Sequence, residues 1–251
     1  MNEQTLNQMK LMKLHGMANA FTSNVESGKL EKYTADELIS LLIDAEWDER
    51  HNRKLDRSLK TARFRYKASV EQLSFDMERN LDKNQIMRLA DCEFIKRKEN
   101  VLITGSTGIG KSYLASALGH HACELGLKVI YQQTSKLFSR LKLAKVDGSY
   151  LREMTRIEKS DLLIIDDFGI QPLDTHSRMC MMEIMEDRHG KSSTIITSQV
   201  PVAGWYEIIG EQTIADAILD RIIHDAHRIE LIGESLRKKG GKEKEAKAQI
   251  N

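Results

Sequence analysis

The stretch NVLITGSTGIGKSYLASAL, residues 100–118, places a glycine-rich loop between an apolar run and a helical pattern. The loop matches G-x-x-x-x-G-K-[ST], a spacing that lets backbone amides turn inward around phosphate oxygens while the following helix adds its dipole. We therefore predict a nucleotide phosphate site, in which Lys111 reaches the β- and γ-phosphates and Ser112 ligates Mg²⁺. The alternative is a glycine turn with an exposed lysine. The predicted binding residues are Gly105, Ser106, Thr107, Gly108, Ile109, Gly110, Lys111, Ser112 and Tyr113.

Short apolar runs alternate with helical stretches over the rest of the chain from about residue 75. Helices are predicted to open near Lys111, Ser135 and Asp174. Buried strands separated by helices indicate an α/β fold with a parallel sheet covered on both faces. The predicted strands are 100–105, 128–134, 161–167, 193–199 and 227–232.

Polar residues end two of these strands. In LLIIDDFG, Asp166 is placed to hold Mg²⁺ through water, and Asp167 to orient or deprotonate an attacking water. Alternatively, Asp167 is only an exposed residue at a strand end. In TSQ, Gln199 is the first choice and Ser198 the second for a side chain beside the γ-phosphate, and turn chemistry before the next proline is the alternative.

Residues 1 to about 70 contain no strand-like run and indicate a small helical module. Thr34 and Glu37 fit a capping box, which predicts a helix opening there and continuing to about Phe64. We divide the chain into a helical N-terminal domain at 1–72 that binds DNA or a partner, an ATPase domain at 73–240, and a charged tail at 241–251.

The formal net charge is +1, so nucleic-acid binding would need local basic patches. The first lies within 50–67, where Asp56 is the one acid and Glu71 is the next along the chain; the second lies within 136–145 and has no acid. Both predict phosphate contacts with little sequence preference. A solvated helix face is the alternative for the first patch. The candidate residues are Arg50, Arg53, Lys54, Arg57, Lys60, Arg63, Arg65, Lys136, Arg140, Lys142 and Lys145.

The three cysteines, Cys92, Cys123 and Cys180, lack metal or redox spacing and are predicted to be buried thiols in a reducing compartment. No run approaches the length of about 18 apolar residues that a membrane span requires. We expect a cytoplasmic protein without membrane contact.

Taken in order, the motifs GSTGIGKS, LLIIDDFG, TSQ, LDR and GESLR resemble the initiator and helicase-loader clade of AAA+ ATPases. The similarity is closer still to the IstB-like helper ATPases of insertion-sequence transposition, and the segments LLIDAEWDERHNRKLDRSLKTARFR and DAILDRIIHDAHRIELIGESLRKK extend it over nearly the whole chain. The resemblance implies an AAA+ P-loop NTPase whose five-stranded parallel sheet has the order 5-1-4-3-2, and ATP sites at the interfaces of a homo-oligomer.

The same resemblance implies roles for single residues. Gln199 matches the first sensor, Arg221 an arginine finger offered to the next subunit, and Arg237 the second sensor; a surface salt bridge is the alternative for either arginine. Two departures stand out. Asp167 replaces the usual Glu, which predicts slow hydrolysis stimulated by DNA or a partner, and little chain remains after the fifth strand, which predicts a rudimentary C-terminal lid.

We therefore expect an ATP hydrolase that uses ATP and Mg²⁺, assembles on double-stranded target DNA, presents it to the transposase of the same element, and remodels or dissolves the complex on hydrolysis. A replicative helicase loader of the same clade is the main alternative. A metabolic kinase lacks an acceptor site here, and a GTPase lacks the N-K-x-D motif. A DNA-coating protein with an inactive ATPase stays open because of Asp167.

Overall fold

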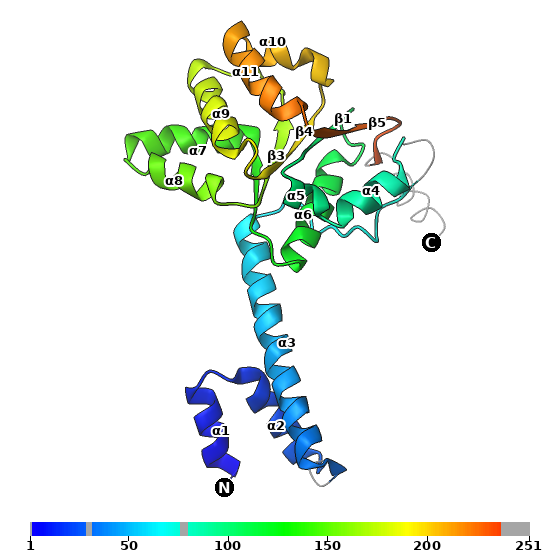
Figure 1. Cartoon of the computed structure of the whole chain (residues 1–251), viewed down its shortest axis with the longest axis vertical. Helices are drawn as coiled ribbons and strands as arrows, with labels where there is room; N and C mark the ends of the chain where they lie inside the picture. The colour runs from blue at the N-terminus through cyan, green and yellow to red at the C-terminus, as the bar shows by residue number, and fades with distance from the viewer. Residues whose placement is uncertain (1, 29–31, 76–79, 237–251) are drawn as a thin grey trace, which may run out of the picture. The chain divides into compact units, whose positions relative to one another are not determined.

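The computed structural model describes residues 2–28, 32–75 and 80–236, and the chain divides into two compact units (Figure 1). The first unit is residues 1–57 and the second is residues 58–251. The sequence-based boundary lies at residue 72, whereas the structure divides after Arg57, within helix α3. The predicted tail at 241–251 lies outside the described residues.

The first unit contains α1 (Asn2–Leu11), α2 (His15–Glu26) and the larger part of α3 (Ala35–Ala62). The capping box at the start of α3 is confirmed, because the Glu37 carboxylate accepts from the Thr34 amide at 2.8 Å and the Thr34 hydroxyl accepts from the Glu37 amide at 3.3 Å. The helix ends at Ala62, close to the predicted end.

Helix α2 approaches α3 closely at Gly16. A Cβ atom there would lie 2.2 Å from the Ala45 carbonyl oxygen, so only glycine fits. The buried Glu46 carboxylate accepts from the amides of Gly16 at 2.8 Å and Met17 at 3.2 Å, and from the Arg50 Nε at 2.6 Å. Glu46 therefore ties the first turn of α2 to the side of α3.

The second unit is built on one five-stranded sheet in which all neighbours are parallel, with the order β2-β3-β4-β1-β5. This is the predicted order 5-1-4-3-2 read from the other edge. The strand bounds also agree with the sequence: they are β1 (Asn100–Gly105), β2 (Val129–Gln133), β3 (Leu162–Phe168), β4 (Ser193–Ser198) and β5 (Ala226–Leu231).

Both faces of the sheet are buried. Leu163 and Ile165 of β3 belong to a core shared with the five helices α7–α11, whereas Ile164 points to the opposite face and contacts α6 beside Gly119. Helix α4 contacts α6 and α5. The helices are α4 (Lys83–Ala90), α5 (Glu93–Arg97), α6 (Lys111–Glu124), α7 (Thr134–Val146), α8 (Tyr150–Glu158), α9 (Thr175–Arg188), α10 (Trp205–Ile209) and α11 (Gln212–Ile223), with a 3-10 turn η3 (Val202–Gly204).

The cysteine and membrane predictions can be compared with the described residues. All three cysteines are buried and unpaired, and burial raises the pKa of Cys92 to about 11 and of Cys123 to about 12. None of the helices in the described ranges has the length and apolar character needed to cross a bilayer.

Replacing Gly16 by alanine is expected to separate α2 from α3 and to weaken the hydrogen bonds to Glu46. Overpacking of this kind costs roughly 1–3 kcal/mol, so the free energy of unfolding of the first unit should fall by that amount. Urea denaturation followed by circular dichroism measures it. The control is Ser23→Ala, an exposed position on the same helix, which should unfold like the parent protein; equal stability of both variants would contradict the close contact.

Candidate nucleotide-binding site

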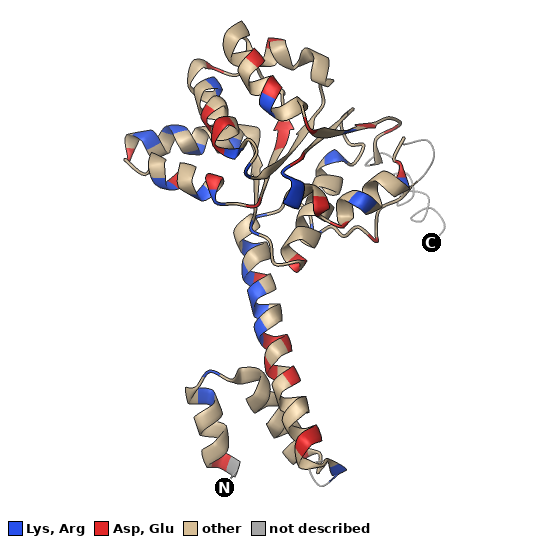
Figure 2. Ribbon diagram, in the orientation of Figure 1, with Lys and Arg blue, Asp and Glu red and all other residues tan. Residues whose placement is uncertain are grey.

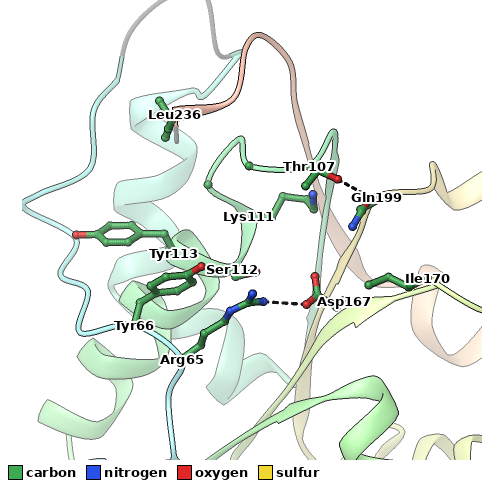
Figure 3. Close-up of a pocket in the computed structure, with 12 residues that line it drawn as sticks. Arg65, Tyr66, Thr107, Lys111, Ser112, Tyr113, Asp167, Ile170, Gln199 and Leu236 are labelled. Carbon is green, nitrogen blue, oxygen red and sulfur yellow. Dashed lines mark hydrogen bonds and ion pairs between the residues drawn. The ribbon is translucent and has the colours of Figure 1, made fainter. Parts of the chain in front are cut away.

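A cavity of about 390 Å³ opens where β1, β3 and β4 end and α6 begins (Figure 3). Carboxyl ends of parallel strands are the usual place for ligands in open α/β sheets. The residues that line it are Arg65, Tyr66, Thr107, Gly108, Gly110, Lys111, Ser112, Tyr113, Asp167, Ile170, Gln199 and Leu236. The predicted phosphate loop and the second carboxylate are therefore brought together.

The N-terminus of α6 carries no side-chain cap. Its N-cap residue is Gly110, with φ of +104°, whereas α4, α9 and α11 are each capped by a carboxylate, from Asp82, Asp174 and Glu211. The amides of the first helical turn need a hydrogen-bond partner. An uncapped helix start that faces a cavity is an anion site, because these amides and the helix dipole both favour negative charge.

The C-terminal edge of the sheet fixes the shape of the loop. A Cβ atom on Gly105, whose φ is +141°, would lie 2.2 Å from the Leu231 carbonyl oxygen at the end of β5. A Cβ on Gly108 would lie 2.2 Å from the Ser235 hydroxyl, and the Leu236 amide donates to the Gly108 carbonyl at 3.0 Å. The loop can adopt this path only with glycine at both positions.

Lys111 folds back over its own loop. Its ammonium donates to the carbonyl oxygens of Gly105 at 2.7 Å and Ser106 at 2.8 Å. Burial lowers the pKa of Lys111, and the carboxylates of Asp167 and Asp166 oppose that shift. The ammonium is thus held at the loop by neutral acceptors.

Asp166 is fully buried and accepts hydrogen bonds on both carboxylate oxygens. Oδ1 accepts from the Ser112 hydroxyl at 2.7 Å and the Thr197 hydroxyl at 2.5 Å, and Oδ2 accepts from the Tyr131 hydroxyl. Burial and the adjacent Asp166 raise the pKa of Tyr131, so the phenol stays a donor. The sequence identified Ser112 and Asp166, but nothing in it indicated that Tyr131 and Thr197 would hold the carboxylate.

Asp167 reaches the same pocket because β3 is irregular at this point. Successive side chains of a regular strand point to opposite faces of the sheet. Between Ile165 and Phe168 the pairing of β3 with β4 shifts, and Asp167 has a left-handed backbone with φ of +61°. The Thr197 hydroxyl accepts from the Asp167 amide at 3.1 Å. A bulge re-aims side chains in this way, and here it brings two consecutive carboxylates to one site.

Arg65 is the unexpected member of this site. The sequence analysis assigned it to DNA, but its Nη1 lies 2.8 Å from Asp167 Oδ2 and 3.4 Å from Asp166 Oδ2 (Figure 3). Burial disfavours the charged guanidinium, but Tyr66 and the two carboxylates raise the pKa of Arg65 overall. In this structure the chain after α3 places Arg65 in the nucleotide pocket, and its assignment to DNA stays a prediction.

Gln199 lines the pocket, and its Oε1 accepts from the Thr107 hydroxyl of the phosphate loop at 2.6 Å. Ser198, the second choice, is buried and donates to the Phe168 carbonyl at 2.7 Å, so it serves the strand pair instead. Of the two residues, Gln199 lines the cavity and Ser198 does not, and the sensor role of Gln199 stays a prediction.

The donor set suits magnesium. Mg²⁺ is bound through one or two carboxylates, hydroxyl oxygens, waters and substrate phosphates, without an all-protein cage. Ser112 and Asp166 supply such oxygens beside the phosphate loop. In the described residues there is no cluster of three or more His, Cys, Asp or Glu side chains that would hold a metal by itself.

A family model described as "IstB-like ATP binding protein" matches residues 7–244. The chain belongs to this family. An insertion sequence ATP-binding protein, y4pL, from Sinorhizobium fredii is 46% identical over 93% of this chain and 96% of its own. The ATP-binding protein of insertion sequence IS21 from Pseudomonas aeruginosa is 30% identical over 91% of this chain and 86% of its own. The resemblance derived from the motifs is thus confirmed.

Solved structures agree on the fold. The DnaC helicase loader superposes with a TM-score of 0.55 at 19% identity, covering 66% of this chain and 98% of that one. AMPPCP-bound DnaA from Aquifex aeolicus superposes with a TM-score of 0.54 at 20% identity, covering 72% and 56%. At these identities the likeness concerns the fold alone, and the AAA+ P-loop architecture is confirmed.

The predicted arginine finger, Arg221, does not line this pocket. Arg221 near the end of α11 pairs with Glu186 of α9 and donates to the Ala217 carbonyl at 2.8 Å. Arg237 lies outside the described residues, as does most of the predicted rudimentary lid.

The basic patch on α3 is partly neutralised by the preceding turns of the same helix (Figure 2). Arg50 pairs with Glu46 at 2.6 Å and Arg53 with Glu49 at 2.8 Å, both at i,i+4 spacing. The sequence analysis counted Asp56 within the patch and Glu71 after it, but not the acids Glu46 and Glu49 that precede or border it. Lys54, Arg57 and Lys60 are exposed, as is Arg63 just after the helix.

In the second patch, on α7, the basic side chains Arg140 and Lys145 also have partners within the fold. Arg140 pairs with Glu153 of α8 at 2.9 Å, and the Lys145 ammonium lies 4.7 Å from the centre of the Tyr150 ring. Lys136 and Lys142 are exposed on this helix. The patch therefore offers fewer charges to a phosphate backbone than its sequence suggests.

Replacing Thr197 by valine is expected to destabilise the second unit, because this nearly isosteric change removes both hydrogen bonds of the hydroxyl and leaves the buried Asp166 with fewer donors. The free energy of unfolding should fall by about 1–3 kcal/mol, measured by urea denaturation with the fluorescence of buried Trp205. Thr197→Ser keeps the hydroxyl, so its free energy of unfolding should fall by less. A valine variant as stable as the parent would contradict the assigned network.

Proposed function

We propose that this IstB-like protein is an ATP-dependent, DNA-binding regulator of DNA transposition. The observation that carries the proposal is the cavity in which an uncapped helix start, Lys111 and Asp167 meet, with the buried Asp166 hydrogen-bonded to Ser112 of its lining. Its relatives' names, which refer to insertion sequences and ATP, support the biological setting.

The residues divide the chemistry among them. The amides of residues 105–112 and the Lys111 ammonium bind the phosphates of ATP, and Gln199 approaches the γ-phosphate end. Ser112 and Asp166, through water, would hold Mg²⁺, which neutralises phosphate charge when bound. Asp167, 23% exposed in its side chain, orients and deprotonates the attacking water. Its short side chain supports slow hydrolysis that a partner stimulates.

Assembly supplies the remaining part of the site. Arg221 of one copy acts on ATP bound to the next, which explains why it stands apart from the pocket of its own chain. An arginine inserted in this way raises phosphoryl-transfer rates by roughly 10³–10⁵. Arg237 stays a proposed second sensor. ATP then drives a homo-oligomer to assemble at double-stranded DNA in the cytoplasm, and hydrolysis dissolves or remodels it.

DNA contacts are assigned to the exposed basic residues of both patches, and the assembled complex presents DNA to the transposase of its element. The alternative partner is a replicative helicase, as suggested by the likeness to the DnaC helicase loader. We favour transposition because the insertion-sequence relatives match along 93% of this chain at up to 46% identity, whereas DnaC matches 66% at 19%.

ATP hydrolysis by the purified protein is expected to be slow and to rise when double-stranded DNA is added. Asp167→Asn tolerates the left-handed backbone but removes the base, so turnover should fall by roughly 10²–10⁴ while binding of a fluorescent ATP analogue persists. Lys111→Ala should lose both binding and turnover. Unchanged turnover in the asparagine variant would overturn the role of Asp167.

DNA affinity is expected to depend on the unpaired charges of α3. The triple variant Lys54→Gln, Arg57→Gln, Lys60→Gln should weaken binding to duplexes of any sequence and reduce the slope of log K against log salt by roughly 3. The comparison variant Arg50→Gln, Arg53→Gln removes charges that Glu46 and Glu49 already neutralise, and should change the slope by less. If both variants change the slope equally for each charge removed, the ion pairs assigned to Arg50 and Arg53 on α3 would be contradicted.

A further inference from the structure

The segment that follows α3 is fastened beside the nucleotide pocket. Helix α3 ends at Ala62, and Arg63 has a left-handed backbone with φ of +61°. The Phe64 ring then lies 4.3 Å from the His120 ring of α6 and 6.0 Å from the Tyr131 ring of β2, measured between centroids. Gly119 makes room for it, since a Cβ there would lie 2.5 Å from Phe64. Arg65 is thus placed by its neighbour in the chain.

The Arg65 guanidinium binds the two carboxylates that the proposed chemistry needs for metal and water. It lies 2.8 Å from Asp167 Oδ2 and 3.4 Å from Asp166 Oδ2, and its side chain is 33% exposed. Asp166 already accepts hydrogen bonds from Ser112, Thr197 and Tyr131. Arg65 adds a fourth hydrogen-bond donor to that carboxylate. Arg65 here supplies the positive charge that a divalent cation would otherwise supply.

A hollow on the other side of Arg65 gives the side chain somewhere to go. This second cavity, of about 400 Å³, is lined by Arg65 together with Arg63, Phe64, Tyr131, Gln132, Gln133 and Lys136. Arg65 therefore lies between the nucleotide pocket and a cavity that offers the side-chain oxygens of Gln132 and Gln133 but also holds the cationic side chains of Arg63 and Lys136. Rotation of one exposed side chain would exchange the first environment for the second.

We propose that Arg65 and Mg²⁺ exclude each other at the carboxylates of Asp166 and Asp167, so that the Arg65 side chain leaves them when Mg–nucleotide binds. This proposal rests on the proposed nucleotide site and adds a response to loading. The Phe64 anchor keeps the segment after α3 in place, so the exchange needs only a rotation of the Arg65 side chain.

Magnesium alone, without nucleotide, tests the competition directly. Arg65→Gln removes the charge, and Arg152→Gln is the matched control: it makes the same change at an exposed arginine of α8 that lines neither cavity. The Mg²⁺ concentration that gives half of the maximal rise in Tm should be lower in Arg65→Gln by about tenfold or more. It should be unchanged in Arg152→Gln.

Arg65→Lys keeps a positive charge but loses the planar guanidinium. Its Mg²⁺ concentration at half of the maximal rise in Tm should lie between those of the parent and Arg65→Gln. Equal half-points in the parent and Arg65→Gln would overturn the proposal. So would weaker binding of a fluorescent ATP analogue by Arg65→Gln with no change in Mg²⁺ dependence, because Arg65 would then be a phosphate ligand.

If the parent binds no ATP analogue at all, the proposed function fails, whereas the magnesium comparison still decides the role of Arg65.

Discussion

The nucleotide site depends on one buried carboxylate. Asp166 has no exposed surface, and donors from the phosphate-loop helix, from β2 and from β4 converge on it. A buried carboxylate without donors would be strongly destabilising, since an unpaired buried charge costs far more than a typical hydrogen bond stabilises. The ends of three strands and the start of α6 are therefore held in register by the same group that the metal requires.

The bulge in β3 allows two consecutive acidic side chains to reach the same site. Two consecutive acids at the end of a regular strand would point to opposite faces of the sheet. The left-handed backbone at Asp167 turns the second carboxylate toward the first, and Thr197 satisfies its amide. Asp and Asn tolerate this conformation better than most residues. A longer acid here would have to adopt the same left-handed backbone, which Glu adopts less readily than Asp.

Much of this architecture could be predicted because local signals agree with the fold. The strand runs, the glycine loop and the capping box each follow from short-range chemistry, and the sheet order followed from the family resemblance. Long-range partners could not be predicted. Arg65 sits in a basic run, and its reach to Asp167 depends on how Phe64 packs over Gly119. The pairing of Arg140 with Glu153 likewise depends on how α7 packs beside α8, whereas the pairing of Arg50 with Glu46 has i,i+4 spacing and could have been predicted from the helix alone.

The close contact between Gly105 and the end of β5 has a consequence for biosynthesis. In the described part of the chain β5 follows the other four strands of the sheet, yet it pairs with β1, and its Leu231 carbonyl closely approaches Gly105 of the phosphate loop. While the ribosome still holds the residues of β5, the loop has been synthesised but the strand that constrains it has not. A nascent chain therefore acquires the shaped loop only after β5 has left the ribosome.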